Sequence, residues 1–268
     1  MFAPEAGCGT KRPPRRHDQH EQLVAIVTAM PEEFEAVAKA VSQPHRRRMA
    51  KGARRFFLEG KIAGAPVLLA MTGDGSVRAS VSGSFFLGEF PVSLLVGAGA
   101  AGALVPSLRS AEIVVGNRVV DEEGDAASPD AELLSRAVAA GAKPVTVVTL
   151  SKLICSSKEK RDLASRFGYS DSAPAVVDTE SAAWARAAAR RGVPWLILRA
   201  VSDTLEDDLP AFIASCLSAD GSVNRADVAR KLVVRPGALP VLLRARRRVR
   251  EAAAGVGLFL EKLLLEKI

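Results

Sequence analysis

The stretch AVVDTESAAWARAAARRGVPWLILRAVSD, residues 175–203, contains a complete strand–helix–strand pattern. The apolar run Ala175–Asp178 predicts a short strand. The hydroxyl and carboxylate side chains of residues 179–181 favour a helix N-terminus, and the alanine-rich segment Ser181–Arg191 predicts the helix itself. Trp195–Val201 is apolar except for one arginine, which is typical of a strand buried on both faces. The stretch therefore predicts an α/β fold.

Two carboxylates, Glu180 and Asp203, follow the two strands of this stretch. We expect these strands to be successive and parallel, so that each side chain leaves the carboxyl end of a strand. In open α/β sheets, ligands bind along that edge. The two carboxylates therefore predict a binding site at one edge of the sheet.

The composition favours one large globular domain, although two small domains would also fit 268 residues, of which 48% are hydrophobic. The cysteines are far apart and form no CxxC pair, so we expect no disulfide framework and no zinc site, and we expect a reducing, cytoplasmic environment. They are Cys8, Cys155 and Cys216. The three histidines lie in polar flanking sequence, which argues against a histidine-centred mechanism. No secretory signal precedes Leu23.

The net charge of +7 is concentrated in three basic segments. They are the tail before residue 20, Arg46–Arg48, which we expect in a loop, and Arg244–Arg250 on a C-terminal helix. Such runs bind nucleic acid or anionic membranes in some proteins and are solvated surface in others. Because aromatic residues make up only 5% of the chain, we expect no nucleic-acid partner. Solvated surface and peripheral membrane contact through the C-terminal helix remain as alternatives.

The first predicted strand, Leu23–Ala29, is followed by a proline and two glutamates. The proline suits a first helical turn, and acidic residues there complement the helix dipole, so Glu32–Val41 predicts a helix. Glu32 and Glu33 have two interpretations that the pattern alone leaves equal. They either cap the helix or deliver a carboxylate to the edge of the sheet where Glu180 lies.

The turn TGDGSVR, residues 72–78, lies between a predicted strand at Pro66–Met71 and a predicted helix at Ser76–Leu87. Two glycines at such a junction expose backbone N–H groups at a helix N-terminus, which suits an anion. Arg78 could add a bidentate contact to a phosphate. The alternative is an ordinary tight turn.

A second glycine motif, GAGAAG at residues 97–102, follows the predicted strand Val92–Val96 and matches the GxGxxG pattern of dinucleotide-binding folds. That pattern must open a helix, but Pro106 follows closely and Ala111–Val115 already predicts the next strand. We therefore reject a dinucleotide fold. We expect the glycines to let a small ligand lie against bare backbone.

Four stretches of the chain resemble, in the same order, the nucleoside phosphorylase and nucleosidase superfamily. They cover roughly Leu23 to Asp203 and are VAIVTAMPEEFEAV, TGDGSVRAS, LLVGAGAAGALVPSLRSAEIVVGNRVV and VVDTESAAWARAAARRGVPWLILRAVSD. The best-known bacterial hydrolases of this superfamily are the methylthioadenosine/S-adenosylhomocysteine nucleosidases. The segment from Leu209 onward is more similar to hopanoid-associated phosphorylases, which act on adenosylhopane.

The resemblance implies a three-layer α/β fold, with a twisted mixed β-sheet flanked by helices, in a homodimer or larger assembly. It makes residues 21–234 a nucleoside phosphorylase-like catalytic domain. A disordered basic tail at residues 1–20 would precede this domain, and an amphipathic basic helix at residues 235–268 would pack on it. The implied activity is cleavage of the N-glycosidic bond of a purine nucleoside, with adenine as the base.

The resemblance also implies roles for individual residues. Asp203 matches the aspartate that hydrogen-bonds or protonates purine N7, Glu180 the glutamate that holds the ribose hydroxyls, and Glu33 the carboxylate that positions water in the hydrolases. Thr72 and Gly73 match the ribose or phosphate loop, and residues 98–102 would border the base. The full substrate-binding set that we predict is Glu180, Thr179, Thr72, Gly73, Arg78, Ala98, Gly99 and Ala100.

This chemistry suits carboxylates. Breaking a ribosyl C–N bond builds positive charge on the sugar and negative charge on the base, so an acid at N7 assists and Glu180 fixes the sugar. Asp203 would have to carry a proton at neutral pH, which an apolar strand favours. Because water or phosphate is a sufficient nucleophile, we expect no metal and no cofactor, with phosphate as a co-substrate only in phosphorolysis.

Three departures from the family pattern leave the substrate open. Thr179 replaces a methionine, Ala100 lacks a hydroxyl, and Asp74 puts a carboxylate where a phosphate would bind. Hydrolysis would depend on Glu33, whereas phosphorolysis would depend on Arg78 and its glycine turn. The remaining alternatives are an adenosyl-lipid of hopanoid synthesis as substrate, methylthioadenosine/S-adenosylhomocysteine hydrolysis in methionine salvage, and a non-catalytic nucleoside-binding protein of the same fold.

Overall fold

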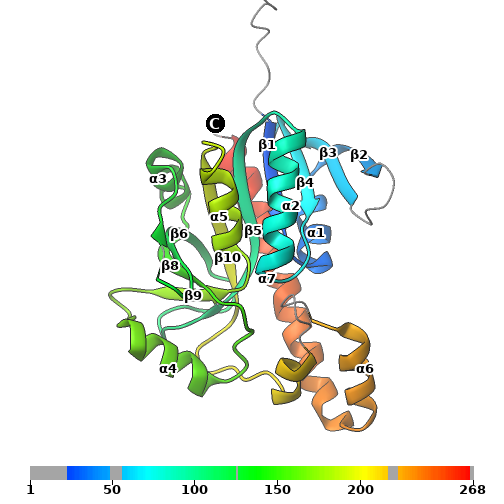
Figure 1. Cartoon of the computed structure of the whole chain (residues 1–268), viewed down its shortest axis with the longest axis vertical. Coiled ribbons are helices and arrows are strands. Elements are labelled where there is room, and N and C mark those ends of the chain that lie inside the picture. Colours follow the sequence, from blue (N-terminus) through cyan, green and yellow to red (C-terminus); the bar gives the residue numbers. More distant parts are fainter. Residues whose placement is uncertain (1–22, 49–55, 125, 217–222, 266–268) are drawn as a thin grey trace, which may run out of the picture.

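The computed structural model describes residues 23–48, 56–124, 126–216 and 223–265, and within them a twisted mixed sheet of ten strands lies between layers of helices (Figure 1). The strands are β1 (Leu23–Thr28), β2 (Ser42–Arg48), β3 (Phe56–Ile62), β4 (Ala65–Met71), β5 (Val92–Ala103), β6 (Ile113–Val120), β7 (Ala126–Ala127), β8 (Lys143–Thr149), β9 (Ala175–Asp178) and β10 (Trp195–Asp203). The helices are α1 (Pro31–Ala38), α2 (Ser76–Glu89), α3 (Ala131–Ala139), α4 (Ser157–Phe167), α5 (Ser181–Ala189), α6 (Arg225–Val233) and α7 (Leu239–Leu265), with 3₁₀ turns at Ala211–Cys216 and Pro236–Ala238. The predicted three-layer α/β fold is confirmed. The predicted tail at residues 1–20 lies outside the described residues.

Strand β5 is the centre of the sheet. It pairs in parallel with β1 on one side and with β10 on the other, and at its end Gly102 and Ala103 pair antiparallel with Val177 and Val176 of β9. From β10 the sheet continues through β6 and β8 to β9. The strands β5, β10, β6, β8 and β9 therefore form a circuit, and the sheet is partly closed.

This closure corrects one prediction. Strands β9 and β10 are not successive parallel strands, because β9 runs antiparallel to β5 whereas β10 runs parallel to it. Glu180 and Asp203 nevertheless line one cavity. They meet because the sheet curls back on itself at the end of β5, and not because two parallel strands end at a common edge.

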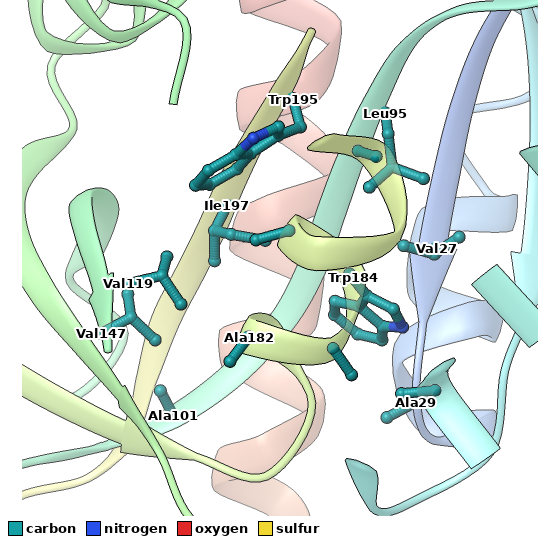
Figure 2. Packing of buried hydrophobic residues seen from close by; sticks show 14 of the residues in the cluster. Val27, Ala29, Leu95, Ala101, Val119, Val147, Ala182, Trp184, Trp195 and Ile197 are labelled. Atoms are coloured by element: carbon teal, nitrogen blue, oxygen red, sulfur yellow. The ribbon is translucent and has the colours of Figure 1, made fainter. Parts of the chain in front are cut away.

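Side chains alternate along β1, so this strand contributes residues to two hydrophobic cores on opposite faces of the sheet. Ala25 and Val27 pack in the core beneath α2 and α5, whereas Val24 and Ile26 pack in the core that α1, α3 and α7 cover. Figure 2 shows the first core, in which Trp184 of α5 lies among side chains from β1, β5 and β10. The two cores hold β5 and β10 rigidly, and these strands carry much of the site.

Two strands differ in extent from the sequence prediction. Arg46–Arg48, expected in a loop, belong to β2, because they pair antiparallel with residues 56–58 of β3. Strand β5 continues through the GAGAAG motif to Ala103 and does not end at Val96. Its neighbours β1, β10 and β9 supply backbone partners along that length, which removes the need for a turn.

Helix α7 belongs to two parts of the molecule. Its second half packs on α1 and β10, with Val256 and Leu260 in the core. Its first half extends with α6 beyond the sheet (Figure 1), where both helices share a small cluster with Phe212 and Ile213. We call residues 225–250 the α6–α7 hairpin. Within the described parts of the chain, no helix is both long enough and apolar enough to cross a membrane.

Candidate active site

A cavity of about 420 Å³ lies between the closing end of the sheet and the α6–α7 hairpin, a size common for small-molecule sites. Its floor is built from the turn after β1, the end of β5, the turn after β9 and the end of β10. Five residues of the predicted site line this cavity: Glu33, Ala100, Thr179, Glu180 and Asp203. Segments that are far apart in the chain therefore contribute to one site.

Glu33 lies in the first turn of α1 and is only 1% exposed. Its Oε2 accepts hydrogen bonds from the N–H groups of Ala29 (2.9 Å) and Met30 (3.0 Å), and its Oε1 accepts one from the N–H of Ala100 (2.8 Å). Burial raises the pKa of Glu33, whereas the charge of Arg199 and the three N–H donors oppose the rise. Three backbone donors thus fix this carboxylate in one orientation.

Glu180 immediately precedes α5 and is also buried. Its Oε1 accepts hydrogen bonds from the N–H of Gly75 (2.8 Å) and from the hydroxyl of Thr179 (2.5 Å), and its Oε2 lies 4.0 Å from Nη2 of Arg199. Burial and the neighbouring charge of Asp178 raise the pKa of Glu180 to about 7, although Arg199 opposes this. The carboxyl group therefore titrates near neutral pH.

Arg199 is the one charged residue in the apolar run of β10, and it is completely buried. Its Nη2 lies 2.6 Å from Oδ2 of Asp178 and donates to the hydroxyl of Ser181 at 2.9 Å, while its guanidinium lies over the ring of Trp184. Nη1 has no hydrogen-bond partner among the described residues. A buried cation is costly unless it is paired, and the nearby carboxylates provide that compensation.

Two glycines of the GAGAAG motif make room for these charged groups. A Cβ atom at Gly99 would overlap Oε1 of Glu33 and Nη1 of Arg199, and one at Gly102 would lie 2.8 Å from Oδ2 of Asp203. The space that a side chain would fill is occupied by the protein's own charged groups, which can approach β5 closely. Ala100 and Gly102 of the motif also line the cavity, so the expectation that a ligand lies against this backbone stays a prediction.

Asp203, at the end of β10, has a cationic partner. Its Oδ2 lies 2.5 Å from Nζ of Lys160, and its Oδ1 accepts a hydrogen bond from the hydroxyl of Ser202 at 2.7 Å. Lys160 is 1% exposed and also donates to the backbone carbonyls of Thr204 (2.7 Å) and Asp207 (3.2 Å). The apolar surroundings that the sequence predicts for Asp203 are therefore interrupted by an ammonium group from α4.

Ion pairs connect the hairpin to the rest of the site. Glu32 accepts hydrogen bonds at 3.2 Å from both Arg225 of α6 and Arg246 of α7, so it ties α1 to the hairpin. Arg248 lies 2.5 Å from Asp207. Partial burial opposes the shift, but hydrogen bonds from Arg248 and Thr204 lower the pKa of Asp207 to about 2.

The outer half of the cavity is largely apolar. Its apolar side chains come from the segment after β10 and from both helices of the hairpin, and polar groups at its rim belong to the arginines that pair with Glu32 and Asp207. The apolar residues include Leu209, Ile213, Val228, Val241, Leu242 and Val249. The cavity thus has a charged floor and an apolar, arginine-rimmed outer half.

The other predicted residues lie outside the lining of this cavity. Thr72 is buried and donates a hydrogen bond to the carbonyl of Thr28 at 3.1 Å, and Gly73 lies against the aliphatic part of Arg78. Arg78 is on the exposed side of α2, and Ala98 is completely buried in the core. Gly99 lies against the side chains of Glu33 and Arg199, as described above. From the TGDG turn, it is Asp74 that lines the cavity.

Sequence reasoning missed three charged residues of this region: Arg199, Asp178 and Lys160. A signal existed for Arg199, because a lone arginine inside an apolar strand must be paired once it is buried. No comparable signal marks Lys160, which lies in a polar helix segment with several other lysines and arginines. Among the described residues, no group of three His, Cys, Asp or Glu side chains gathers as metal ligands would.

A partly closed, mixed α/β sheet with buried carboxylates beside its central strand and a cavity at its closing end defines the class of this domain. The chain belongs to the phosphorylase superfamily, whose family model matches residues 23–230. That match includes every residue of the charged floor and ends before α7.

The chain is similar to several curated nucleosidases. It is 27% identical over 237 residues to the 5'-methylthioadenosine/S-adenosylhomocysteine nucleosidase of Halalkalibacterium halodurans, covering 80% of this chain and 99% of that protein. The enzyme of the same name from Shewanella frigidimarina is 26% identical over 208 residues, covering 70% of this chain and 88% of that protein.

Solved structures share the fold. A nucleosidase of this type from Neisseria meningitidis, in complex with methylthio-immucillin-A, aligns with a TM-score of 0.70 at 20% identity, covering 91% of this chain and 99% of that one. The native futalosine hydrolase of Helicobacter pylori aligns with a TM-score of 0.70 at 17% identity, covering 93% and 100%.

Proposed function

We propose that the protein hydrolyses the N-glycosidic bond of an adenine nucleoside. The observation that carries this proposal is Glu33, a buried carboxylate that three backbone N–H groups hold at the floor of the cavity, beside Arg199. Burial raises its pKa toward the range in which a general base is most effective. The relatives named above as nucleosidases support adenine nucleosides as the substrate class.

In this mechanism the C1′–N9 bond breaks and its electron pair leaves with the base. A water molecule adds to C1′ of the sugar cation and gives its proton to Glu33. Arg199, whose Nη1 lies beside the same glycine as Oε1 of Glu33, would act from beneath the floor as a positioning residue that stabilises the carboxylate. Glu180 would accept hydrogen bonds from the ribose hydroxyls and so hold the sugar in the reactive geometry.

Asp203 would assist departure of the base. For this step Asp203 takes up a proton from solvent and delivers it to N7 of adenine, and the ammonium of Lys160, which favours the ionised carboxyl group, promotes the delivery. Lys160 acts in this scheme as a positioning residue, because it contacts Asp203 and backbone carbonyls but does not line the cavity.

Three features favour water over phosphate as the nucleophile. The N–H of Gly75, which an anion would use, donates to Glu180. Asp74 contributes a carboxylate to the cavity, where it would repel phosphate, and Arg78 does not line the cavity. Phosphorolysis through Arg78 and its glycine turn therefore has less structural support than hydrolysis through Glu33.

The outer half of the cavity supports a nucleoside with a large apolar 5′ substituent. A methylthio group needs little space, whereas Leu209, Ile213, Leu242 and Val249 offer an extended apolar lining. An adenosyl-lipid would bury its chain there, at a gain of about 25 cal/mol for each Å² removed from water. Methylthioadenosine remains the second candidate, because curated relatives are named for it.

The test is chromatographic detection of free adenine. The protein would receive adenosine, methylthioadenosine, S-adenosylhomocysteine or adenosine with a long alkyl 5′ group, each with and without phosphate. We expect adenine without phosphate, with the highest kcat/KM for the alkyl nucleoside. Adenine that forms only with phosphate would overturn hydrolysis. Tight binding of all four compounds without adenine would indicate a nucleoside-binding protein.

A further inference from the structure

The end of the α6–α7 hairpin exposes several large apolar side chains. Val233 is 82% exposed and Val234 is 75% exposed, and Leu239 and Leu243 at the start of α7 are also exposed. This end of the molecule projects away from the sheet and from the helices that cover it (Figure 1). Apolar side chains clustered at a projecting tip contribute nothing to the core and suggest a contact with another apolar phase.

The same segment is strongly basic. Residues 228–250 contain eight Arg or Lys residues and no Asp or Glu. Two of the basic residues, Arg246 and Arg248, pair with Glu32 and Asp207 beside the cavity. Others, such as Arg230, Arg247 and Arg250, have exposed side chains, although Arg230 and Arg247 also pair with Asp227 and Glu251. The hairpin therefore carries a dense positive charge on the part of its surface that faces away from the domain.

The apolar and basic groups share one side of α7. Leu239, Leu243, Arg247 and Arg250 follow one another at intervals of four, four and three residues, which places them along one stripe of a helix. The opposite side of α7 carries Leu242 and Val249 toward the cavity. The helix thus separates the site from an outward stripe in which leucines lie near the tip and arginines lie behind them.

We propose that the tip of the α6–α7 hairpin docks on the surface of an anionic lipid bilayer. Valine and leucine side chains at the tip enter the boundary between headgroups and acyl chains, while the arginines bind lipid phosphates, the arrangement of interfacial membrane-binding segments. Charge complementarity selects this occupant, because the hairpin has a large excess of basic residues, with Asp227 as its one acidic residue, and the phosphates of an anionic bilayer match that charge over the whole tip.

Docking in this orientation gives the site a route from the membrane. Val228 of α6 and Leu242 of α7 line the outer cavity, and Val233 and Leu239 lie at the tip of the same two helices. A nucleoside anchored by an apolar 5′ chain would move along these helices into the cavity. This step rests on the proposed function, but docking itself does not.

Sedimentation with lipid vesicles, without any nucleoside, tests the docking. We expect the full chain to bind vesicles of phosphatidylcholine with about one third phosphatidylglycerol, and to bind pure phosphatidylcholine at least about tenfold more weakly. Raising salt from about 0.1 to about 0.5 M should weaken binding further, because screening shortens the range of charge attraction. Equal binding to both vesicle types, or none to either, would overturn the proposal.

Matched variants localise the contact. Arg230→Gln/Arg247→Gln removes two charges from the hairpin and should lower the anionic-vesicle partition coefficient about tenfold or more, whereas Lys39→Gln/Arg190→Gln removes two exposed charges elsewhere and should leave it unchanged. Equal effects of the two pairs would mean that total charge alone drives binding, against the proposed tip.

A second pair of variants isolates the apolar contribution. Val233→Ser/Leu239→Ser should lower vesicle binding about tenfold or more, whereas Leu258→Ser, exposed on the same helix about 28 Å from Leu239, should not. Neither variant changes the charged floor, so adenine release from a soluble nucleoside reports folding and activity independently. If Val233→Ser/Leu239→Ser abolished self-association in ultracentrifugation and left vesicle binding intact, a second copy would be the occupant and the membrane proposal would fail.

Discussion

The charged groups at the floor of the cavity have several partners inside the protein, whereas the outer half is formed by the segment after β10 and by one projecting hairpin. Glu33 alone accepts three backbone hydrogen bonds, and Arg199 is completely buried between Asp178 and Trp184. The outer half depends on apolar contacts and on arginines that pair with Glu32 and Asp207 near the surface.

This difference assigns two tasks to two parts of the cavity. In the proposed function, the floor carries out bond cleavage and the outer half selects the substrate. A floor in which each atom is fixed by several bonds suits bond cleavage, which needs groups held within a fraction of an ångström. A hairpin with a small core of its own can change without disturbing that floor. The family match includes the floor and ends at residue 230, so the side of the outer half that α7 contributes, Leu242 and Val249 among it, lies beyond the matched residues.

The strongest test of the floor is Glu33→Gln. The amide is the same size but cannot take a proton from water, so we expect kcat to fall by about a thousandfold. Adenine release at saturating substrate measures this. Glu35→Gln, an exposed change on the same helix, is the control. A loss of less than about tenfold would remove Glu33 from the reaction.

Arg199→Met tests whether the floor depends on the cation beside Asp178, Glu180 and Glu33. The change leaves Asp178, Glu180 and Glu33 buried together without compensation, so the free energy of unfolding should fall by about 3–5 kcal/mol. Urea unfolding measures it. Arg186→Met, which breaks a half-exposed pair with Asp121, should cost less than about 1 kcal/mol. If both variants lost a similar free energy of unfolding, the buried ion pairs of the floor would be no more important for stability than a half-exposed pair.

The titration of Glu180 should make stability depend on pH. Its pKa is raised from 4.5 to about 7 in the folded state, so the unfolded chain releases this proton at lower pH than the folded protein does. Stability should therefore fall as pH rises through that window, by about 3 kcal/mol. Urea unfolding between about pH 4.5 and pH 8 should show a smaller slope for Glu180→Gln than for the wild type. If stability changed with pH equally in the wild type and in Glu180→Gln, this pH dependence would not come from Glu180.

Lys160→Met tests a positioning residue between the two halves. Without the ammonium, the carboxylate of Asp203 loses the partner that stabilises it after proton transfer, so we expect kcat to fall about 10- to 100-fold with little change in KM. Lys158→Met, exposed on the same helix, is the matched control. An effect confined to KM would show that Lys160 acts on substrate binding and not on the leaving base.

We expect the smallest effect on activity from a substitution in the outer half of the cavity. Leu242→Asn should lower kcat/KM for an alkyl-substituted nucleoside about tenfold, because a polar group replaces an apolar contact, and should leave adenosine unaffected. Leu258→Asn, far along α7, controls for helix propensity. If both substrates lost activity equally, the outer half would support the fold and not the choice of substrate.

Local features of the chain were predictable from the sequence. The polar pattern predicts helices at Ser157–Phe167 and Arg225–Val233, and α4 and α6 have these bounds. Ser156 and Asn224 accept hydrogen bonds from the first turn of each helix and so mark the starts. Strand β9 is likewise an apolar run between polar neighbours. Each of these signals lies within a few residues of the element it defines.

Long-range features were not predictable. The pairing of β5 with β9 joins residues more than seventy positions apart, and no local pattern encodes it. For the same reason, the partners of the glycines at 99 and 102 and the contact between Lys160 and Asp203 emerge only once the sheet closes. Glu180 was predicted because it follows a strand, and Glu33 was singled out by the family resemblance after the pattern had left it open, whereas a partner from a distant helix leaves no local mark.

The packing of α7 on α1 affects how the chain can fold while it is being synthesised. Val24, Ile26 and Val37 near the start of the chain are covered by Val256 and Leu260 near its end. When the ribosome has synthesised all the strands of the sheet, it has not yet synthesised α7, the helix that buries these side chains. Until the final helix emerges, the nascent chain presents an apolar sheet face, a state in which multi-strand proteins associate wrongly and engage chaperones.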